Sequence, residues 1–224
     1  QHCPWNRTTM RTPAPLWIFD LDNTLHDASH GIFPHINREM TAYIMRHLDV
    51  DAAQAQQIRE VYWHRYGATL TGLVKHHGVQ PAHFLRETHP IESLLDRLRF
   101  DPRVAGWLKQ LRGQKVVFSN GPTHYARAVV GKMKLHPHLS AVFGIDHFAC
   151  VPKPRLQPYR QLLGRLGVAG RRCIMVEDSV HNLLPAKRLG MTTVWLAPQR
   201  VTTPGFVDYH IRHLSELVRL PCAR

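Results

Sequence analysis

Short apolar runs alternate with amphipathic stretches over most of this chain. The first run, residues 16–19, is rich in branched and aromatic side chains and follows two prolines, which is typical of a central strand in an α/β domain. Runs of the same kind predict further strands at residues 115–119, 141–143, 173–176, 192–196 and 207–210. Helical patterns predict helices at about 102–112, 155–166, 180–189 and 212–219, and one that begins after residue 122. This alternation predicts a doubly wound parallel sheet.

The interval 33–98 departs from this alternation because it contains only helical patterns. A helix that opens at Pro34 carries apolar residues at three- and four-residue spacing, and Asp51 is the expected cap of a second helix that stops at Gly67. Shorter helices are predicted at 69–77, 82–88 and 91–98. Five helices after a lone first strand predict an insertion. We therefore expect a loose lead-in at 1–14, an α/β core at 15–25 and 103–224, and a helical insertion at 26–102.

Polar side chains directly follow three of the predicted strands. These residues are Asp20 and Asp22 after the first strand, Ser119 and Asn120 after the second, and Glu177 and Asp178 after the strand at 173–176. Because ligands of an open parallel sheet bind beyond the carboxyl ends of its strands, we expect all six at one edge. Lys153 lies in a loop between two prolines, which gives its flexible side chain a fixed origin. Taken alone, the first pair has a second interpretation, a solvated turn with an Asx cap at Asn23.

This set of side chains suits a phosphate ester together with a metal ion. The carboxylates of Asp20, Asp22 and Asp178 are the hard oxygen ligands that Mg²⁺ prefers. The turn at 119–121, which opens a helix, and the compact charge of Lys153 favour an anion. With the charge neutralised, one aspartate can attack phosphorus while a second moves the proton. Asp20 and Asp22 can fill these two roles.

Four segments resemble, in order and spacing, the four motifs of the haloacid dehalogenase-like hydrolase superfamily. They are Asp20-Leu21-Asp22-Asn23-Thr24, Ser119-Asn120, Lys153-Pro154 and Glu177-Asp178-Ser179. The resemblance covers about residues 15 to 200 and implies a Rossmann-like core, with the inserted helices of 26–102 as a cap over the active site. The namesake dehalogenases lack the second aspartate of the first motif, so Asp22 favours phosphate chemistry over carbon–halogen cleavage.

The resemblance implies a role for each matching residue. Asp20 would be the nucleophile and Asp22 the general acid and base, while Lys153 would orient Asp20 and balance its charge. The residues expected to hold the phosphoryl group are Thr24, Ser119, Asn120, Gly121 and Lys153. The residues expected to bind Mg²⁺ are Asp20, Asp22 through its carbonyl, and Asp178, with Glu177 acting through a metal-bound water.

Within the phosphatases, the chain is most similar to the pyrimidine 5'-nucleotidase-like branch. The similarity rests on residues 22–25, 66–73, 124–127, 179–183 and 186–195, and it departs at His26, where the branch often has tyrosine. We therefore expect an Mg²⁺-dependent phosphatase that hydrolyses a small phosphomonoester, a pyrimidine nucleoside 5'-monophosphate, through an aspartyl-phosphate. Alternatives with the same motifs are a phosphoglycolate-type phosphatase and a phosphosugar mutase. An alternative of another class is a catalytically idle regulatory protein that binds an anionic partner.

Composition narrows the range of partners. The formal net charge of +13 favours phosphorylated or polyanionic partners, but the 29 Lys and Arg are spread along the chain without a nucleic-acid motif. We expect a small phosphorylated substrate and no specific nucleic-acid binding. No apolar run approaches the roughly 20 residues that span a bilayer, and residues 1–7 lack the apolar core of a signal peptide, so a cytoplasmic protein is expected. The four cysteines are scattered, which predicts reduced thiols.

Two groups of side chains in the insertion have both a functional and a structural interpretation. Tyr62, Trp63 and Tyr66 could stack on a base, but their helical spacing favours packing between cap helices. Four histidines show no clear metal-ligand face, and we expect them to be surface or packing residues. They are His76, His77, His83 and His89.

Overall fold

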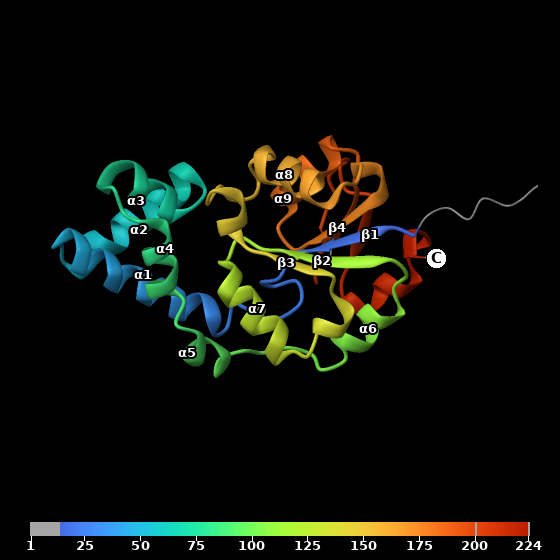
Figure 1. Ribbon diagram of the computed structural model, residues 1–224, viewed down its shortest axis with the longest axis horizontal. Coiled ribbons are helices and arrows are strands. Elements are labelled where there is room, and N and C mark those ends of the chain that lie inside the picture. The colour runs from blue at the N-terminus through green and yellow to red at the C-terminus, as the bar shows by residue number, and fades with distance from the viewer. Residues whose placement is uncertain (1–13, 200, 224) are drawn as a thin grey trace, which may run out of the picture.

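A parallel sheet of six strands forms the centre of the protein in the computed structural model, which describes residues 14–199 and 201–223 (Figure 1). The strands are Leu16–Phe19 (β1), Gln114–Phe118 (β2), Ala141–Phe143 (β3), Cys173–Glu177 (β4), Thr192–Leu196 (β5) and Tyr209–Ile211 (β6). Their order is β3-β2-β1-β4-β5-β6, and every neighbouring pair is parallel. The predicted α/β class and the central position of β1 are confirmed.

Alternate residues of the central strands pack into two apolar layers. In β1, Trp17 and Phe19 belong to one layer and Ile18 to the other, because successive side chains of a strand point to opposite faces. The first layer is covered by α6 (Val104–Gln110), α7 (Thr123–Lys132) and the 3-10 helix η4 (Leu214–Arg219), and the second by α8 (Leu156–Leu166) and α9 (Val180–Arg188). Figure 1 shows α8 and α9 above the sheet and α6 and α7 below it.

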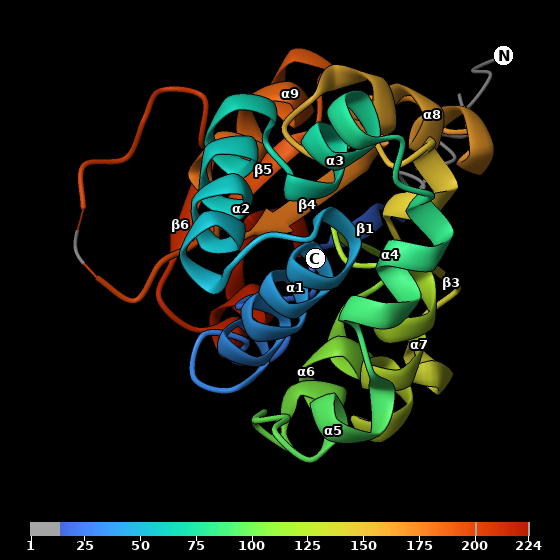
Figure 2. The same ribbon diagram turned by 90° about the vertical axis from the view of Figure 1, so that its left-hand side faces the viewer.

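Five helices follow β1 before the chain reaches α6. They are α1 (Ile32–Leu48), α2 (Ala52–Tyr66), α3 (Thr69–His77), α4 (Pro81–Thr88) and α5 (Ile91–Leu95). Helices α1 to α4 lie together at the left-hand end of Figure 1, which faces the viewer in Figure 2, whereas α5 lies lower, beside α7. Residues of α1 to α4 share a third apolar cluster, which also contains Ile145 from beyond β3. Ile32 and Ile36 of α1 and Leu94 of α5 belong to the first layer of the sheet. The helix expected over 91–98 is shorter because Arg97 N–H bonds to a carbonyl only three residues earlier. The domain boundaries at 26 and 102 remain a prediction.

Both ends of α2 are fixed by its local sequence. Asp51 accepts a hydrogen bond from Gln54 N–H at 2.9 Å, and the Gln54 side chain accepts one from Asp51 N–H at 3.1 Å. This reciprocal capping box satisfies two backbone donors at the start of the helix. Gly67 ends the helix with a φ of 81°, in the left-handed region that glycine adopts freely.

Two segments join the inserted helices to the core, and they lie side by side. Asp27 N–H donates to Arg99 O at 2.8 Å in an antiparallel bridge. On the segment that leads from β1 to α1, Asn23 has a φ of 60°, which asparagine tolerates better than most residues. Its Oδ1 accepts hydrogen bonds from the N–H groups of Ala28 and Ser29, both at 3.0 Å. The chain therefore turns sharply directly after Asp22. Asn23 caps no helix, because its backbone donors lie five and six residues later and the N-cap of α1 is Gly31.

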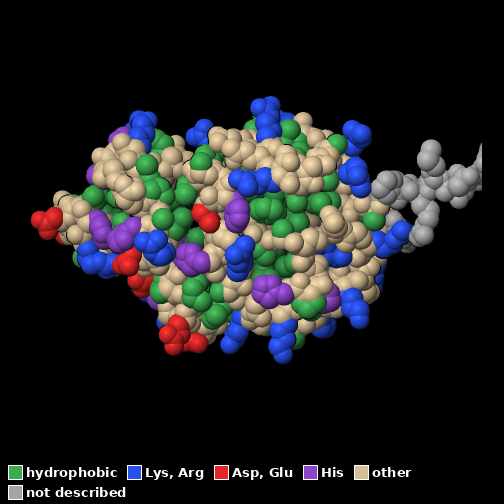
Figure 3. Space-filling view, viewed as in Figure 1, with side chains coloured by type: hydrophobic (Ala, Val, Ile, Leu, Met, Phe, Trp, Pro, Cys, Tyr) green, Lys and Arg blue, Asp and Glu red, His purple; other side chains and the backbone are tan. Residues whose placement is uncertain are grey.

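The remaining predictions from composition concern the surface and the termini. The lead-in predicted at 1–14 falls outside the described residues, apart from residue 14. None of the helices in the described part is long and apolar enough to cross a membrane. On the face drawn in Figure 3, Lys and Arg side chains are spread over the surface, whereas most acidic side chains lie toward the end formed by the inserted helices. The cytoplasmic location stays a prediction.

We expect Gly72→Ala to destabilise the packing of α3 against α2. A Cβ atom at position 72 would lie 2.2 Å from Cγ of Tyr62, so the two helices would have to separate. Overpacking of this kind costs roughly 1–3 kcal/mol in the free energy of unfolding. The control is Gly164→Ala in α8, whose added Cβ meets no described atom within 4 Å. It should leave stability unchanged or raise it by up to about 1 kcal/mol. Urea unfolding measures both variants, and equal midpoints would contradict the prediction.

Candidate active site at the carboxyl edge of the sheet

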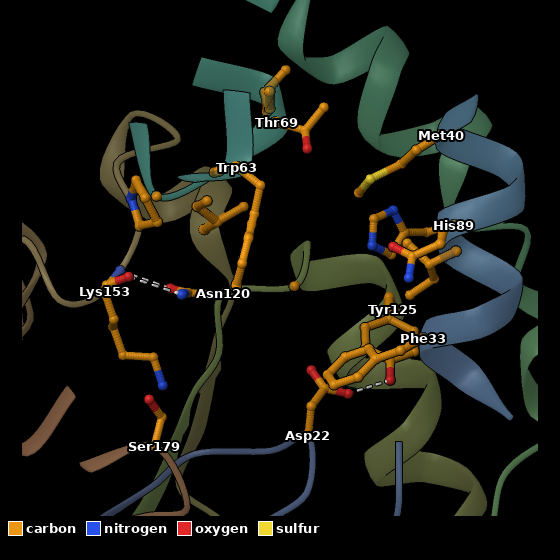
Figure 4. A pocket seen from close by; sticks show the side chains of 18 of the residues that line it. Asp22, Phe33, Met40, Trp63, Thr69, His89, Asn120, Tyr125, Lys153 and Ser179 are labelled. Carbon is orange, nitrogen blue, oxygen red and sulfur yellow. Dashed lines mark hydrogen bonds between the residues drawn. The ribbon is translucent and has the colours of Figure 1, made fainter. Parts of the chain in front are cut away.

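The carboxyl ends of β1, β2 and β4 bring the predicted site residues to one edge of the sheet. Asp20 follows β1, Ser119 follows β2 and Glu177 ends β4. The parallel register continues past β1, because Asp20 N–H donates to Val176 O at 3.0 Å. The loop that carries Lys153 reaches the same edge, so four segments distant in sequence meet beside one cavity (Figure 4).

Lys153 joins three of these segments. Its Nζ donates to Asp20 Oδ1 at 2.6 Å, to Glu177 Oε2 at 2.8 Å and to Phe118 O at 2.9 Å. The lysine side chain is 1% exposed. Burial disfavours its ammonium form, but the charges of Asp20 and Glu177 outweigh burial and raise the pKa of Lys153 above its usual range. Lys153 is therefore charged, and it fixes the orientation of the Asp20 carboxylate.

Asn120 holds the loop that positions this lysine. Its Oδ1 accepts a hydrogen bond from Lys153 N–H at 2.8 Å, and its Nδ2 donates to Lys153 O at 3.1 Å. Figure 4 shows the two side chains and this pair of bonds. The Asn120 amide is thus used on the backbone of Lys153, which leaves its own backbone N–H for any contact with a phosphate.

The cavity has a volume of about 630 Å³ and lies between the sheet edge and the inserted helices. Asp20, Asp22 and Asp178 line its core side. Its other walls combine apolar with charged residues of the inserted helices. The apolar ones include Phe33, Ile36, Met40, Trp63, Leu70, Phe84 and Leu85, and the charged ones are Arg59 and Glu60. Trp63, which we expected to pack between helices, is 57% exposed and lines this cavity. The packing expected of the neighbouring tyrosines is confirmed by hydrogen bonds to histidines of α3, Tyr62 to His77 and Tyr66 to His76.

Three carboxylates surround the single ammonium group. Burial and then the charge of Glu177 raise the pKa of Asp20 to about 7, although Lys153 opposes this. Burial likewise raises the pKa of Glu177 to about 7. Burial and the charge of Asp20 raise the pKa of Asp178. These side chains therefore leave an excess of negative charge that a divalent cation would balance.

The same residues could hold that cation. Asp20, Glu177 and Asp178 each offer a carboxylate oxygen, and these oxygens lie within 4.8 Å of one another. Hard oxygen donors gathered around one point suit an ion such as Mg²⁺ or Mn²⁺. The donor set fits a divalent metal, and it includes Glu177, which we expected to act only through a water.

The other predicted phosphate-binding residues are packed around this cluster. Thr24 Oγ1 donates to Asp178 Oδ1 at 3.5 Å, and Ser119 Oγ accepts a hydrogen bond from Gly121 N–H at 2.9 Å. Thr24 and Ser119 are buried, and of these three predicted residues only Gly121 is among the described residues that line the cavity. Contacts of Thr24, Ser119 and Gly121 with a phosphate remain a prediction.

The start of α7, which we expected to favour an anion, already has a carboxylate partner. Asp146 Oδ1 accepts hydrogen bonds from Thr123 N–H at 2.7 Å and from Thr123 Oγ1 at 2.8 Å. A carboxylate at this position satisfies one of the free backbone donors of the helix. With Thr123 N–H bonded to Asp146 and Gly121 N–H bonded to Ser119 Oγ, the Asn120 N–H group is the backbone donor of this turn that is left for a phosphate.

Asp22 is held by two side chains to which sequence analysis assigned no role. Tyr125 Oη donates to Asp22 Oδ1 at 2.5 Å, and His26 Nε2 lies 3.0 Å from the same oxygen. Burial alone would raise the pKa of Asp22, but the hydrogen bonds from His26 and Tyr125 outweigh it and lower that pKa. One signal was present in the sequence, because Tyr125 lies in the first turn of the helix that follows the turn at 119–121.

His89 is the other residue whose position was not predicted. It was expected at the surface or in packing, but it is 5% exposed and lines the cavity, with its ring centroid 5.7 Å from that of Tyr125. Burial and then the charge of His124 lower the pKa of His89 to about 4. A neutral imidazole therefore lies beside the acid–base end of the site.

The fold and this site define the class of protein. The sequence model of the haloacid dehalogenase-like hydrolases matches residues 16–190, a span that contains all four motifs and the inserted helices. The chain belongs to this family of hydrolases.

Several relatives match nearly the whole chain. A glyceraldehyde 3-phosphate phosphatase of Methanocaldococcus jannaschii is 24% identical and covers 90% of this chain and 94% of its own length. A phosphoglycolate phosphatase of Xanthomonas campestris is 25% identical over 83% of each chain, and a 5'-nucleotidase of Pseudomonas aeruginosa is 24% identical over 80% of this chain and 81% of its own. A HAD phosphatase structure from Thermococcus onnurineus has the same fold, with a TM-score of 0.66 at 21% identity over 92% of this chain and 96% of its own.

We expect the buried His89 to make folding less favourable as the pH falls from about 6.5 toward about 4. Its pKa in the folded protein, about 4, lies below the ordinary value of 6.5. In this interval the unfolded chain therefore binds a proton that the folded protein excludes, and stability is lost with falling pH. His89→Gln should lose less stability than the wild type between about pH 7 and about pH 5. Melting temperatures measure this, with the exposed His136→Gln as control. A pH dependence that His89→Gln shares with the wild type would refute the prediction.

Proposed function

We propose that this hydrolase is a phosphatase that cleaves a small phosphomonoester through an aspartyl-phosphate. The observation that carries the proposal is the contact of Lys153 Nζ with Asp20 Oδ1 at 2.6 Å, at the wall of a cavity whose core side also holds the carboxylates of Asp22, Glu177 and Asp178. The lysine holds one oxygen of Asp20, while Oδ2 has no hydrogen-bond partner among the described residues and is available to attack phosphorus. The phosphatase activities for which the relatives are named support the proposal.

In the proposed reaction Asp20 is the nucleophile and Asp22 is the general acid and base. Asp20 Oδ2 attacks phosphorus, the bond from phosphorus to the leaving oxygen breaks, and Asp22 gives that oxygen a proton. A water then attacks the same phosphorus, Asp22 takes a proton from it, and the bond to Asp20 breaks. Asp22 is ionised in the free protein, which suits the second step. The negative charge of a bound phosphate beside it favours its protonated form, which the first step needs.

We propose Mg²⁺ as the metal, held by Asp20, Asp178 and the carbonyl of Asp22, with Glu177 adjacent. The bound ion supplies positive charge to the phosphate oxygens and to the carboxylates that surround them. The chain's own residues do the remaining work. Lys153 balances Asp20 and Glu177. The backbone N–H group of Asn120 is the donor of the turn that is left for the substrate anion, because Gly121 N–H is bonded to Ser119 Oγ.

A nucleoside 5'-monophosphate with a pyrimidine base is the substrate that we propose. The cavity extends from the carboxylates to an apolar region with the exposed faces of Trp63 and Phe33, which are 57% and 37% exposed. Flat aromatic side chains of this kind favour stacking on a base. The Pseudomonas aeruginosa relative named a 5'-nucleotidase supports this choice. Phosphoglycolate is the second candidate, favoured by the Xanthomonas campestris relative, although so small a molecule leaves the apolar region unfilled.

Replacing the proposed nucleophile should abolish the activity. We expect Asp20→Asn to release phosphate at least about 10³-fold more slowly than the wild type, because an amide cannot form the covalent intermediate. The wild type should lose its activity on chelation with EDTA and recover it with Mg²⁺. Phosphate release from nucleotides, phosphoglycolate and sugar phosphates is the measurement.

The matched control for this substitution is Asp49→Asn, at an exposed residue of the inserted segment with a φ of 52°, which asparagine adopts readily. It should keep the wild-type rate. Full activity in Asp20→Asn, or no phosphate release by the wild type with any of these substrates, would exclude the proposed function.

Trp63, on the wall of the cavity, should determine the preference for a substrate whose leaving group carries a base. We expect Trp63→Ala to lower kcat/KM for uridine 5'-monophosphate by roughly tenfold, since stacking on a base contributes about 1–3 kcal/mol. The rate with phosphoglycolate should change little, because that substrate has no base to stack on the tryptophan. Val61→Ala, an exposed apolar residue of the same helix, is the control and should change neither value. Equal losses on both substrates would argue against a nucleotide.

A further inference from the structure

We propose that Tyr125 and His26 are positioning residues that reserve one oxygen of Asp22 for proton transfer. This inference rests on the proposed phosphatase function and adds two residues that lie outside the four motifs. Both contacts are made to the same atom, since Tyr125 Oη lies 2.5 Å and His26 Nε2 3.0 Å from Asp22 Oδ1. Asp22 Oδ2 has no hydrogen bond among the described residues, and Asp22 lines the cavity.

Two donors on one oxygen restrict the rotation of the carboxyl group. The terminal torsion of an aspartate is broad and roughly two-fold, so a free Asp22 could present either oxygen to the cavity. Donors that approach Oδ1 from two elements define a single orientation. Figure 4 shows Tyr125 and Asp22 facing each other, with this hydrogen bond drawn between them. The opposite oxygen, Oδ2, is then the one left for a substrate or a water.

The surroundings hold the two donors rigidly in turn. Tyr125 is 1% exposed on α7, and its ring packs beside that of His89. The His26 side chain is fully buried, and the His26 backbone forms a bridge with Asp22 itself. His26 Nδ1 has no hydrogen-bond partner among the described residues. Burial of a ring nitrogen without a partner costs free energy, so stability alone does not explain a histidine here. Its contact with Asp22 does.

The positioned oxygen has one role in each half of the reaction. In the first half, the proton on Oδ2 moves to the leaving oxygen as its bond to phosphorus breaks. In the second half, Oδ2 takes a proton from the attacking water as the bond between phosphorus and Asp20 breaks. A misplacement of about 1 Å in such a group can cost about 10²-fold in rate. Loss of either donor should therefore impair the proton transfers and leave substrate binding intact.

Two kinds of substrate separate this role from a merely structural one. The kcat/KM value reports the steps up to formation of the aspartyl-phosphate. An alkyl phosphate needs a proton on its leaving oxygen in those steps, whereas p-nitrophenyl phosphate releases a nitrophenolate that needs none at neutral pH. We expect Tyr125→Phe to lower kcat/KM for an alkyl phosphate by about tenfold or more relative to p-nitrophenyl phosphate. The alkyl substrate is uridine 5'-monophosphate or phosphoglycolate, whichever the wild type hydrolyses faster.

His26 provides a second variant and a rescue. His26→Leu should show the same selective loss, whereas His26→Gln, whose amide can still donate to Asp22, should recover part of it. Tyr43→Phe is the matched control, because it removes another buried tyrosine hydroxyl whose partner is His83 in the inserted helices. It should leave the ratio of the two kcat/KM values unchanged. Melting temperatures show that each variant is folded.

The outcomes of this experiment are distinct. A selective loss with the alkyl substrate in Tyr125→Phe supports the positioning role. An equal loss with both substrates, or no loss, in a folded Tyr125→Phe overturns it while the phosphatase function stands. A wild type without activity, or an active Asp20→Asn, overturns the proposed function and this inference with it.

Discussion

The ammonium group of Lys153 is buried among Asp20, Glu177 and the carbonyl of Phe118, and the rest of the site depends on this one contact. Removal of one partner from a buried ion pair costs about 3–5 kcal/mol, because an uncompensated charge is left inside. Here a single nitrogen bonds the residue after β1, the last residue of β2 and the last residue of β4. The backbone ladder of β1 with β2 and β4 sets the spacing of these strand ends, and the lysine holds the carboxylates of Asp20 and Glu177 around one point. Asn120 completes this arrangement, since it holds the backbone of the lysine from the neighbouring loop.

The two sides of the cavity differ in composition. The clustered carboxylates and Lys153 lie at the sheet edge, whereas the inserted helices supply apolar side chains together with Arg59 and Glu60. The relatives named for different phosphorylated substrates match this chain over most of its length at about equal identity, 24 to 25%. In this chain, the charge cluster and the wall opposite it are thus formed by different parts of the fold.

Much of the fold was predictable because local patterns dictate it. The apolar composition of residues 16–19 placed β1 at the centre of the sheet, and the polar residues after the strands had to meet at one edge. The spacing of Tyr62, Trp63 and Tyr66 could not reveal that Trp63 alone turns to the cavity, since helical periodicity does not say which neighbour covers each face. Tyr125, His26 and His89 were missed for a related reason. Their contacts with or near Asp22 depend on how α7 and the inserted helices pack, and not on any local pattern.

The bridge between Asp27 and Arg99 brings the two ends of the inserted segment together. The inserted segment leaves the core and returns to it at neighbouring points, with Asp27 N–H bonded to Arg99 O. An insertion whose two ends are adjacent places no demand on the distance between β1 and β2, whatever its length. A change of length within such a segment need not shift Asp20, provided that it keeps the contacts of Ile32, Ile36 and Leu94 with the first apolar layer. The adjacent ends therefore separate the length of the inserted segment from the geometry of the sheet edge.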